Sequence, residues 1–378
     1  MIYLDAAAQE PLHPAARAVL AENLDLCGDP RRLYHQARRA RLLLDQAREQ
    51  VAEALCVRAD EVIFTSSGTD AVHRGLLGLH RGASRGGARP TSAALVIGGV
   101  EHGSVRHAAA WAQQTTGAAY VESAVDSHGR VQPESIADAV VGLGEHVVIA
   151  VQSANHEVGT VQPVARIAQS CDLHPVFVDA CASMGRLPLP SGWQAAAGSA
   201  IKWGGPPGVG VLVVRKKARW RSAFPGDDRT DYRSSGFENV AACAAAAAAL
   251  TAMTEAGAAM RARQFELTAR LRGRLAAIPD TDVVGDPVDR LPHLVTASFL
   301  YVDGEALVSE LDRAGYAVAS GSACAASTLE PSAVLAAMGA LTHGNVRISL
   351  PVETDVDIDG LADRIEATVG LLRGRVGL

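Results

Sequence analysis

Short apolar runs alternate with amphipathic segments through the first half of the chain. The apolar runs are rich in β-branched residues and have the length of strands buried on both faces. They span residues 61–65, 93–97, 145–151 and 175–179. Segments with a helical pattern lie between them, at residues 70–79, 104–114, 133–141 and 164–171. This alternation predicts an α/β fold with a mixed, mostly parallel sheet covered by helices.

The order of elements changes after Pro279. Before that point, an alanine-rich helix is expected from about residue 239 to 275, and its run at 244–249 suits close packing in a core. After it, the pattern predicts strands at 293–301 and 345–350 and helices at 304–314, at 331–338 and at the C-terminus. We therefore predict a large domain of residues 14–255. A smaller α+β domain would combine residues 1–13 with residues 256–378.

Composition limits the classes of partner. The chain is 48% apolar, enough for a sizeable core, and its formal net charge of −6 argues against nucleic acid as a main partner. An arginine-rich stretch at 31–41 runs into leucines and predicts an amphipathic helix with a solvated basic face. We expect no membrane span and no signal peptide. The six cysteines show no zinc spacing, so we expect a reduced cytoplasmic protein without a metal site.

Lys202 stands in a glycine-rich segment of small and apolar residues, 198–210, together with Ser199. About twenty residues earlier, an apolar run ends in Asp179. This combination suits pyridoxal phosphate (PLP), because a lysine amine can hold PLP as a Schiff base and a carboxylate can keep its pyridine nitrogen protonated. Lys202 could instead be a surface lysine beside a turn, but its apolar surroundings favour a desolvated amine.

Three further segments place polar groups at the carboxyl ends of predicted strands, where α/β sheets bind ligands. In the first, Gly68 and Thr69 begin a helix and form a cup for phosphate. In the second, His102 could stack on a flat ring, carry protons or be purely structural. In the third, Asn155 and His156 could reach the ring oxygen of PLP or the substrate.

With these residues, the chain resembles the cysteine desulfurases, which are PLP enzymes of the class V aminotransferase, fold type I group. The similarity runs from Tyr3-Leu4-Asp5 to residues 346–350. Its most specific part is Ala-Ser-Gly-Ser-Ala-Cys-Ala at 319–325, which is similar to the catalytic-cysteine loop of the NifS/IscS-like subgroup. The resemblance implies a homodimer with active sites near the subunit interface. It also implies that L-cysteine is converted to alanine, leaving a persulfide on Cys324 for a sulfur-acceptor protein.

The resemblance also implies roles for single residues. Lys202 would move the α-proton of the substrate, and His102 would carry a proton while the Cys324 thiolate attacks the substrate sulfur. Arg347 would bind the substrate carboxylate bidentately, with Asn155 also at the substrate. Cys324 could instead be a small buried hydrophobe and Arg347 a surface residue, but a Gly/Ser/Ala-rich loop favours an exposed nucleophile.

Four positions depart from the usual family pattern. Ile201 replaces the histidine before the lysine, and Ala182 replaces a glutamine three residues after the strand-end aspartate. His156 replaces the second asparagine of an Asn-Asn-Glu motif, and Phe237 stands near the place of a threonine that contacts phosphate. Several hydrogen bonds to the cofactor are therefore lost or replaced.

Three functions remain open at this point. The favoured one is a cysteine desulfurase that supplies sulfur for iron–sulfur assembly, tRNA thiolation or DNA phosphorothioation. The second is a related PLP enzyme, such as a selenocysteine lyase or an aminotransferase-like enzyme, and the Cys324 segment argues against it. The third is a non-catalytic partner-binding protein that keeps PLP as a structural element. Its support is the set of replaced cofactor contacts. The sequence does not identify the sulfur acceptor.

Overall fold

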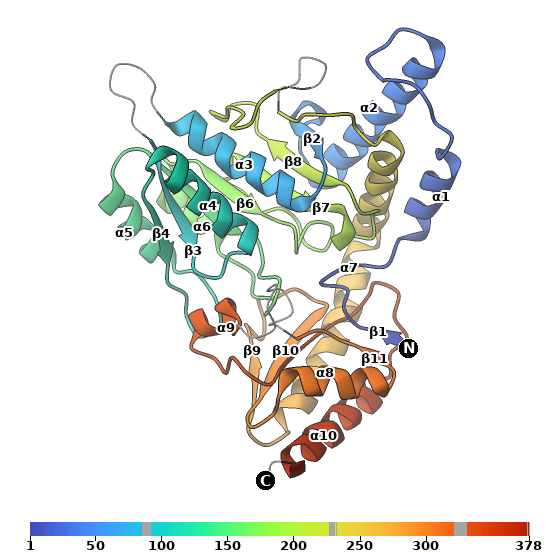
Figure 1. Ribbon diagram of the computed structural model, residues 1–378, viewed down its shortest axis with the longest axis vertical. Helices are drawn as coiled ribbons and strands as arrows, with labels where there is room; N and C mark the ends of the chain where they lie inside the picture. Colours follow the sequence, from blue (N-terminus) through green and yellow to red (C-terminus); the bar gives the residue numbers. More distant parts are fainter. Residues whose placement is uncertain (85–91, 227–230, 232, 321–330, 376, 378) are drawn as a thin grey trace.

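The computed structural model describes residues 1–84, 92–226, 231, 233–320, 331–375 and 377. Figure 1 shows a broad part built around a large sheet and a narrower part that carries the C-terminal helix. The predicted nucleophile Cys324 lies outside the described residues.

Within the described residues, the large sheet has seven strands in the order β2-β8-β7-β6-β5-β3-β4. Only β8 is antiparallel to its neighbours, and the other pairs are parallel. The predicted mostly parallel sheet is thus confirmed. The strands are β2 Val62–Thr65, β3 Ala94–Gly98, β4 Tyr120–Ser123, β5 Val147–Gln152, β6 Val176–Asp179, β7 Ala195–Ser199 and β8 Gly210–Val214.

Both faces of this sheet are buried under helices (Figure 1). Successive side chains of a strand point to opposite faces, and in β6 Phe177 enters one apolar core while Val178 enters the other. Such two-sided burial explains why the strands are continuous apolar runs. The helices of this part are α1 Pro14–Glu22, α2 His35–Leu55, α3 Gly68–Ala83, α4 Gly103–Thr116, α5 Pro133–Leu143 and α6 Val164–Ser170.

A second, antiparallel sheet with the order β12-β10-β9 supports the C-terminal part. Leu4 belongs to the apolar core of this part, and β1 pairs with β11. The strands are β1 Ile2–Tyr3, β9 Thr281–Val284, β10 Leu294–Phe299, β11 Tyr316–Ala317 and β12 Asn345–Ser349. The helices are α8 Gly304–Arg313, α9 Ala333–Met338 and α10 Ile358–Arg375.

The long helix α7, Val240–Ala276, joins the two parts. Its alanine-rich first half packs against α1 and α2, and its second half packs against α10 and the small sheet. The backbone at Gly257 is not helical (φ 11°, ψ −95°), so α7 bends there. The domain boundary predicted between residues 255 and 256 stays a prediction, and this bend lies beside it.

Among the described residues, one segment is long and apolar enough to span a membrane by length and composition alone, although no run of that length was expected from the sequence. This segment is α7. Its many alanines favour a long helix and also make that helix apolar. Of its most apolar window, 61% is buried inside the protein. The core helix of a soluble protein has the same properties.

Candidate active site

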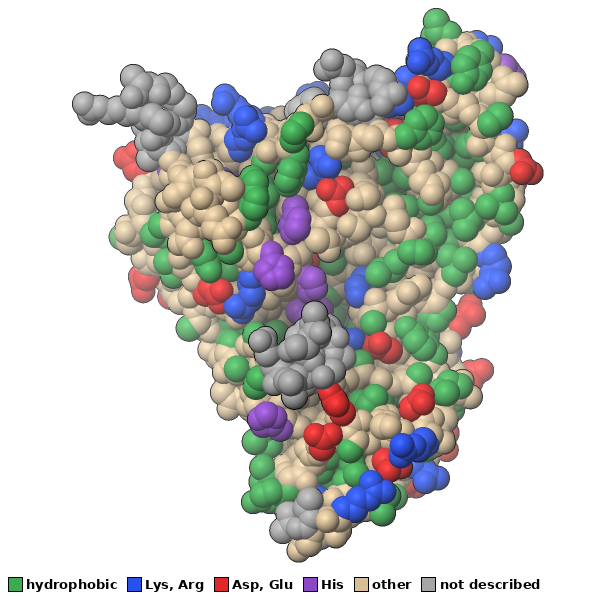
Figure 2. Space-filling model, in the orientation of Figure 1, with side chains coloured by type: hydrophobic (Ala, Val, Ile, Leu, Met, Phe, Trp, Pro, Cys, Tyr) green, Lys and Arg blue, Asp and Glu red, His purple; other side chains and the backbone are tan. Residues whose placement is uncertain are grey.

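A cavity of about 320 Å³ lies at the carboxyl ends of β5, β6 and β7. Its volume is in the range of small-molecule sites. Figure 2 shows histidine side chains gathering along a hollow of the surface between the broad and narrow parts. Most sequence-predicted site residues line this cavity, namely Gly68, Thr69, His102, His156, Asp179, Ser199, Lys202 and Arg347.

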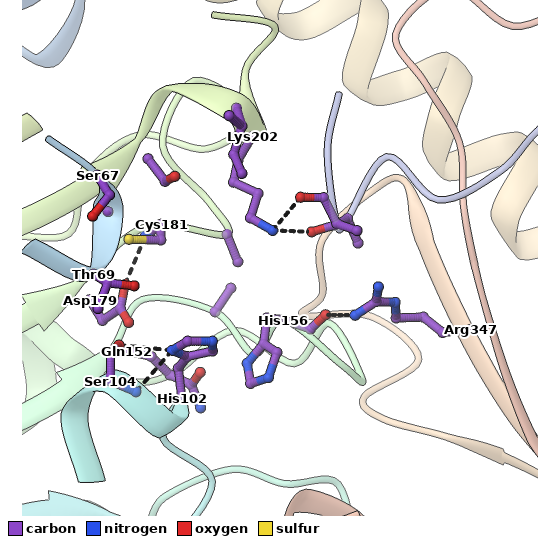
Figure 3. Close-up of a pocket in the computed structure, with 17 residues that line it drawn as sticks. Ser67, Thr69, His102, Ser104, Gln152, His156, Asp179, Cys181, Lys202 and Arg347 are labelled. Carbon is purple, nitrogen blue, oxygen red and sulfur yellow. Dashed lines mark hydrogen bonds between the residues drawn. The ribbon is translucent and has the colours of Figure 1, made fainter. Parts of the chain in front are cut away.

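Lys202 follows the end of β7 and points into the cavity, opposite His102 and His156 (Figure 3). Its Nζ donates hydrogen bonds of 2.6 and 2.7 Å to the carbonyl oxygens of Ala7 and Ala8. These carbonyl groups belong to the segment after β1, which β12 holds through its strand-end serine hydroxyl. The amine is therefore aimed into the cavity by a contact that spans nearly 200 residues of sequence.

Asp179 is the last residue of β6, and its carboxylate lies on the cavity wall. Its Oδ1 accepts a 2.9 Å hydrogen bond from the backbone N–H of Cys181, and the Cys181 thiol also bonds this carboxylate. Burial, together with the Asp179 charge, holds the pKa of the Cys181 thiol well above its usual value. The thiol of Cys181 is therefore protonated near neutral pH, which makes it a poor nucleophile.

The N-terminus of α3 forms the end of the cavity beside Ser199. Ser67 caps the helix by accepting the N–H of Asp70. A Cβ atom at Gly68 would lie 2.6 Å from Cβ of Ser199, so only glycine fits where the helix start meets β7. The free N–H groups of the first helical turn, next to Thr69, are suited to bind a phosphate group.

His102 caps α4, and this contact fixes the position of its proton. Nδ1 accepts the backbone N–H of Ser104 at 3.1 Å and lies 2.8 Å from the Ser104 hydroxyl. The proton of the neutral ring is therefore on Nε2. Burial lowers the pKa of His102, and Lys202 lowers it further, while Asp179 opposes the shift. His102 is thus a neutral N–H donor near pH 7.

His156 lies beside His102, with ring centroids 5.0 Å apart and planes at 79°. Burial holds its pKa well below the usual value, and the charges of Arg347 and Lys202 act in the same direction. The cavity therefore contains two neutral imidazoles.

Arg347 extends from β12 and is buried (3% exposed). It donates from Nη2 to Asp5 Oδ1 at 2.8 Å and from Nη1 to the carbonyl oxygen of His156 at 3.2 Å. Nε is buried, and among the described residues it has no hydrogen-bond partner. The guanidinium has five N–H groups and these two hydrogen bonds use two of them, so it keeps N–H groups with which to bind a carboxylate.

Asn155 is placed differently from the other predicted site residues. Its side chain is fully buried and does not line the cavity. Nδ2 donates to the carbonyl oxygen of Val100 at 3.0 Å, and Oδ1 accepts the N–H groups of Glu157 and Val158, both at 2.8 Å. Asn155 shapes the turn that carries His156, and its amide is already engaged by the backbone.

The cavity wall also contains groups that the sequence did not single out. Gln152 is the last residue of β5, so the rule that ligands bind at strand ends could have found it. Cys181 could have been found two residues after Asp179. The carbonyl groups of Ala7 and Ala8 belong to the backbone, so no residue type in the sequence indicates that they contact Lys202.

The residues of the cavity fit PLP. A lysine enters the cavity, a strand-end carboxylate lies on its wall, and a helix N-terminus with an obligatory glycine supplies N–H groups for the phosphate. Fold and site together define a PLP-dependent enzyme of fold type I.

The chain belongs to the class-V aminotransferase family, whose model matches residues 2–361. It is 30% identical to cysteine desulfurase IscS of Dictyoglomus turgidum, over 98% of this chain and 95% of that protein. It is 34% identical to the IscS-like cysteine desulfurase of Mycobacterium tuberculosis, over 94% of each chain. A solved NifS-like protein superposes with a TM-score of 0.86 at 25% identity, covering 98% of this chain and 99% of the other.

Proposed function

We propose that the protein is a cysteine desulfurase, which converts L-cysteine to L-alanine and passes the sulfur to an acceptor. The observation that carries this proposal is the meeting of Lys202, Asp179, His102 and Arg347 in one cavity. The relatives named cysteine desulfurase, similar over nearly the whole chain, support it.

In this proposal, each cavity residue binds one part of PLP or of the substrate. The first turn of α3, at Gly68 and Thr69, would hold the phosphate of PLP, with Ser199 beside it, and Asp179 would pair with the pyridine nitrogen. The chemistry supplied by bound PLP is that of an electron sink, which stabilises negative charge on the substrate. Lys202 holds the cofactor and then takes and returns the substrate α-proton at Nζ.

The remaining residues handle the substrate carboxylate and sulfur. Arg347 would bind the carboxylate, and the N–H on Nε2 of the neutral His102 ring would donate a hydrogen bond to the substrate. The Cys324 thiolate forms a bond to the substrate sulfur while the Cβ–S bond breaks, and a proton replaces the sulfur on Cβ. One cysteine and one thiol thus give one alanine and one persulfide, so atoms and electrons balance.

Three further features belong to the same proposal. The protein forms a homodimer with its active sites near the interface, as in the family it belongs to. It is a soluble cytoplasmic protein, and the burial of α7 supports this. It makes no direct contact with nucleic acid or membrane, and the negative net charge supports the first point.

The experiment that tests the function uses the purified PLP-loaded protein with L-cysteine and a thiol reductant. We expect sulfide and alanine in equal amounts, and alanine release from L-cysteine would separate a desulfurase from a selenocysteine lyase. Bound PLP without alanine formation would contradict the proposal and leave the partner-binding alternative.

Replacement of Arg347 by lysine is expected to raise KM for L-cysteine roughly 10- to 100-fold, with a smaller change in kcat. The reason is the loss of a charge-assisted hydrogen bond of about 1.5–3 kcal/mol, which lysine cannot replace in the same geometry. Steady-state kinetics measures the effect. Arg290→Lys is the control, since Arg290 is buried but lies outside the cavity wall. An unchanged KM in Arg347→Lys would contradict the substrate-binding role.

Replacement of Ala182 by glutamine is expected to tighten PLP binding about 2- to 10-fold, because it restores one net hydrogen bond of about 0.5–1.5 kcal/mol. Ala182 lines the cavity, so a longer side chain there can reach the bound cofactor. The rate of PLP loss on dialysis measures the effect. Ala182→Leu adds similar bulk without the hydrogen bond and should not tighten binding. Equal tightening by both variants would mean that bulk, rather than hydrogen bonding, limits PLP retention.

A further inference from the structure

His156 borders two cavities at once. One is the main cavity, and the other is a small cavity of about 10 Å³ that is also bordered by Ala182, Lys202 and His293. His293 immediately precedes β10 and is 1% exposed. Ala182 also lines both cavities.

Two nitrogen atoms of these imidazoles are buried without a partner. Within the described part of the chain, neither Nδ1 of His156 nor Nδ1 of His293 has a hydrogen bond. Buried polar atoms are normally satisfied by protein groups or by ordered water, because leaving them unpaired is unfavourable. Two such atoms on residues that share one small cavity point to a common partner.

Both imidazoles are neutral near pH 7. Burial is the first cause, and it holds the pKa of each well below the usual value. Neighbouring charged or titratable groups act in the same direction: His102, Arg347 and Lys202 on His156, and Arg186, Arg347, Lys202 and Arg290 on His293. A neutral imidazole has one N–H donor and one acceptor nitrogen, so a single bridging group can pair with both rings.

We propose that one ordered water molecule binds in the small cavity and bridges Nδ1 of His293 to Nδ1 of His156. A water molecule needs at least about 10–15 Å³, and the volume of this cavity, about 10 Å³, lies at the lower end of that range. The water accepts the N–H of His293 and donates one O–H to His156. The proton of His156 then resides on Nε2, which leaves an N–H donor for the main cavity.

His293 is thus a positioning residue that acts through His156. The backbone of His156 is held independently, because Arg347 donates to its carbonyl oxygen. The bridging water adds control of the ring and its tautomer, as hydrogen bonds on one imidazole nitrogen set the state of the other. This inference rests on the proposed function in one respect: the N–H of His156 would serve as a donor to the negatively charged ring oxygen of PLP.

A high-resolution crystal structure of the PLP-loaded protein tests the water directly. We expect a single ordered water within hydrogen-bond distance of both Nδ1 atoms, and nitrogen NMR should find the His156 proton on Nε2. A dry cavity, or a proton on Nδ1 of His156, would overturn the inference. Neither result depends on whether the protein releases sulfide, so failure of the proposed function is detected separately.

A pair of variants tests the positioning role. His293→Leu removes Nδ1. His293→Asn keeps a polar atom bonded to Cγ, which is the atom that carries Nδ1 in histidine. The readout is the pH midpoint of the visible absorbance of bound PLP. We expect His293→Leu to raise it by about half a pH unit or more, since a weaker donor stabilises the ring-oxygen anion less. His293→Asn should restore the wild-type midpoint.

The control is His343→Leu, at an exposed position, which should leave the midpoint unchanged. A wild-type midpoint in a folded His293→Leu protein would reject the role of His293. An unrestored midpoint in a folded His293→Asn protein would also reject it, because a purely packing role would then explain both variants.

Discussion

Cys324→Ser is expected to release no sulfide above background from L-cysteine, while the protein keeps its bound PLP. Serine preserves the size of the side chain, but its hydroxyl is a far weaker nucleophile toward sulfur than a thiolate. Sulfide and alanine are measured together with the visible absorbance, which reports PLP retention. Mass spectrometry of the wild-type protein after treatment with cysteine should find one added sulfur on the peptide that contains Cys324.

The structure contains a second candidate for the sulfur-accepting thiol, which this experiment distinguishes from Cys324. Cys181 is a second thiol, and it lies on the cavity wall itself. Its raised pKa and its bond to Asp179 argue that it stays protonated and does not accept sulfur. Added sulfur on Cys181, or full sulfide release by Cys324→Ser, would therefore reverse the assignment. Cys27→Ser is the control, because Cys27 is an exposed free cysteine and should leave turnover unchanged.

The sequence predicted two of the three strands at whose ends the cavity lies, β5 and β6, because they are buried on both faces and form continuous apolar runs. β3, β5 and β6 lie within a few residues of the predicted ranges. β7 was missed, since Ala195-Ala196-Ala197-Gly198-Ser199 has almost no intrinsic strand preference and is a strand only because β6 and β8 flank it. The antiparallel strand β8 was missed as well, although its valine-rich run has the usual strand composition.

Most predicted site residues meet in the cavity because strand ends and helix starts define one edge of the sheet. Asp179 ends β6, Gly68 begins α3 and His102 caps α4, so local pattern was sufficient to place them. Arg347 lies on the other sheet, and its place was implied by family resemblance. Their individual roles in catalysis stay predictions.

Other features of the site depend on contacts that no local pattern encodes. The carbonyl groups that receive the Lys202 amine come from Ala7 and Ala8, brought there by the pairing of β1 with β11. Asn155 has the residue type of a ligand contact, but its amide is engaged by the backbone of its own turn. His293 gave no signal, because only the folded chain brings it to the cavity that His156 borders.

Lys202→Ala is expected to abolish the covalent attachment of PLP. The wild-type protein should be yellow when purified, and Lys202→Ala should lose its visible absorbance after dialysis against a competing amine. The physical reason is that the Nζ atom of Lys202 is the amine that the structure directs into the cavity, through two short hydrogen bonds to backbone carbonyl groups. Without it, PLP is held only by contacts with the phosphate, the ring and Asp179, and these exchange freely.

The matched control for this prediction is Lys216→Ala. Lys216 is solvent-exposed and pairs with Asp60 at 3.4 Å, away from the cavity wall. It should keep the wild-type absorbance through the same dialysis. Thermal unfolding of both apoproteins separates loss of the cofactor from loss of the fold. An absorbance band that survives dialysis in Lys202→Ala would show that a different amine holds PLP. The roles proposed for Asp179 and for the start of α3 depend on their positions relative to Lys202. That outcome would therefore also remove the geometric argument that Asp179 binds the pyridine nitrogen and that α3 binds the phosphate.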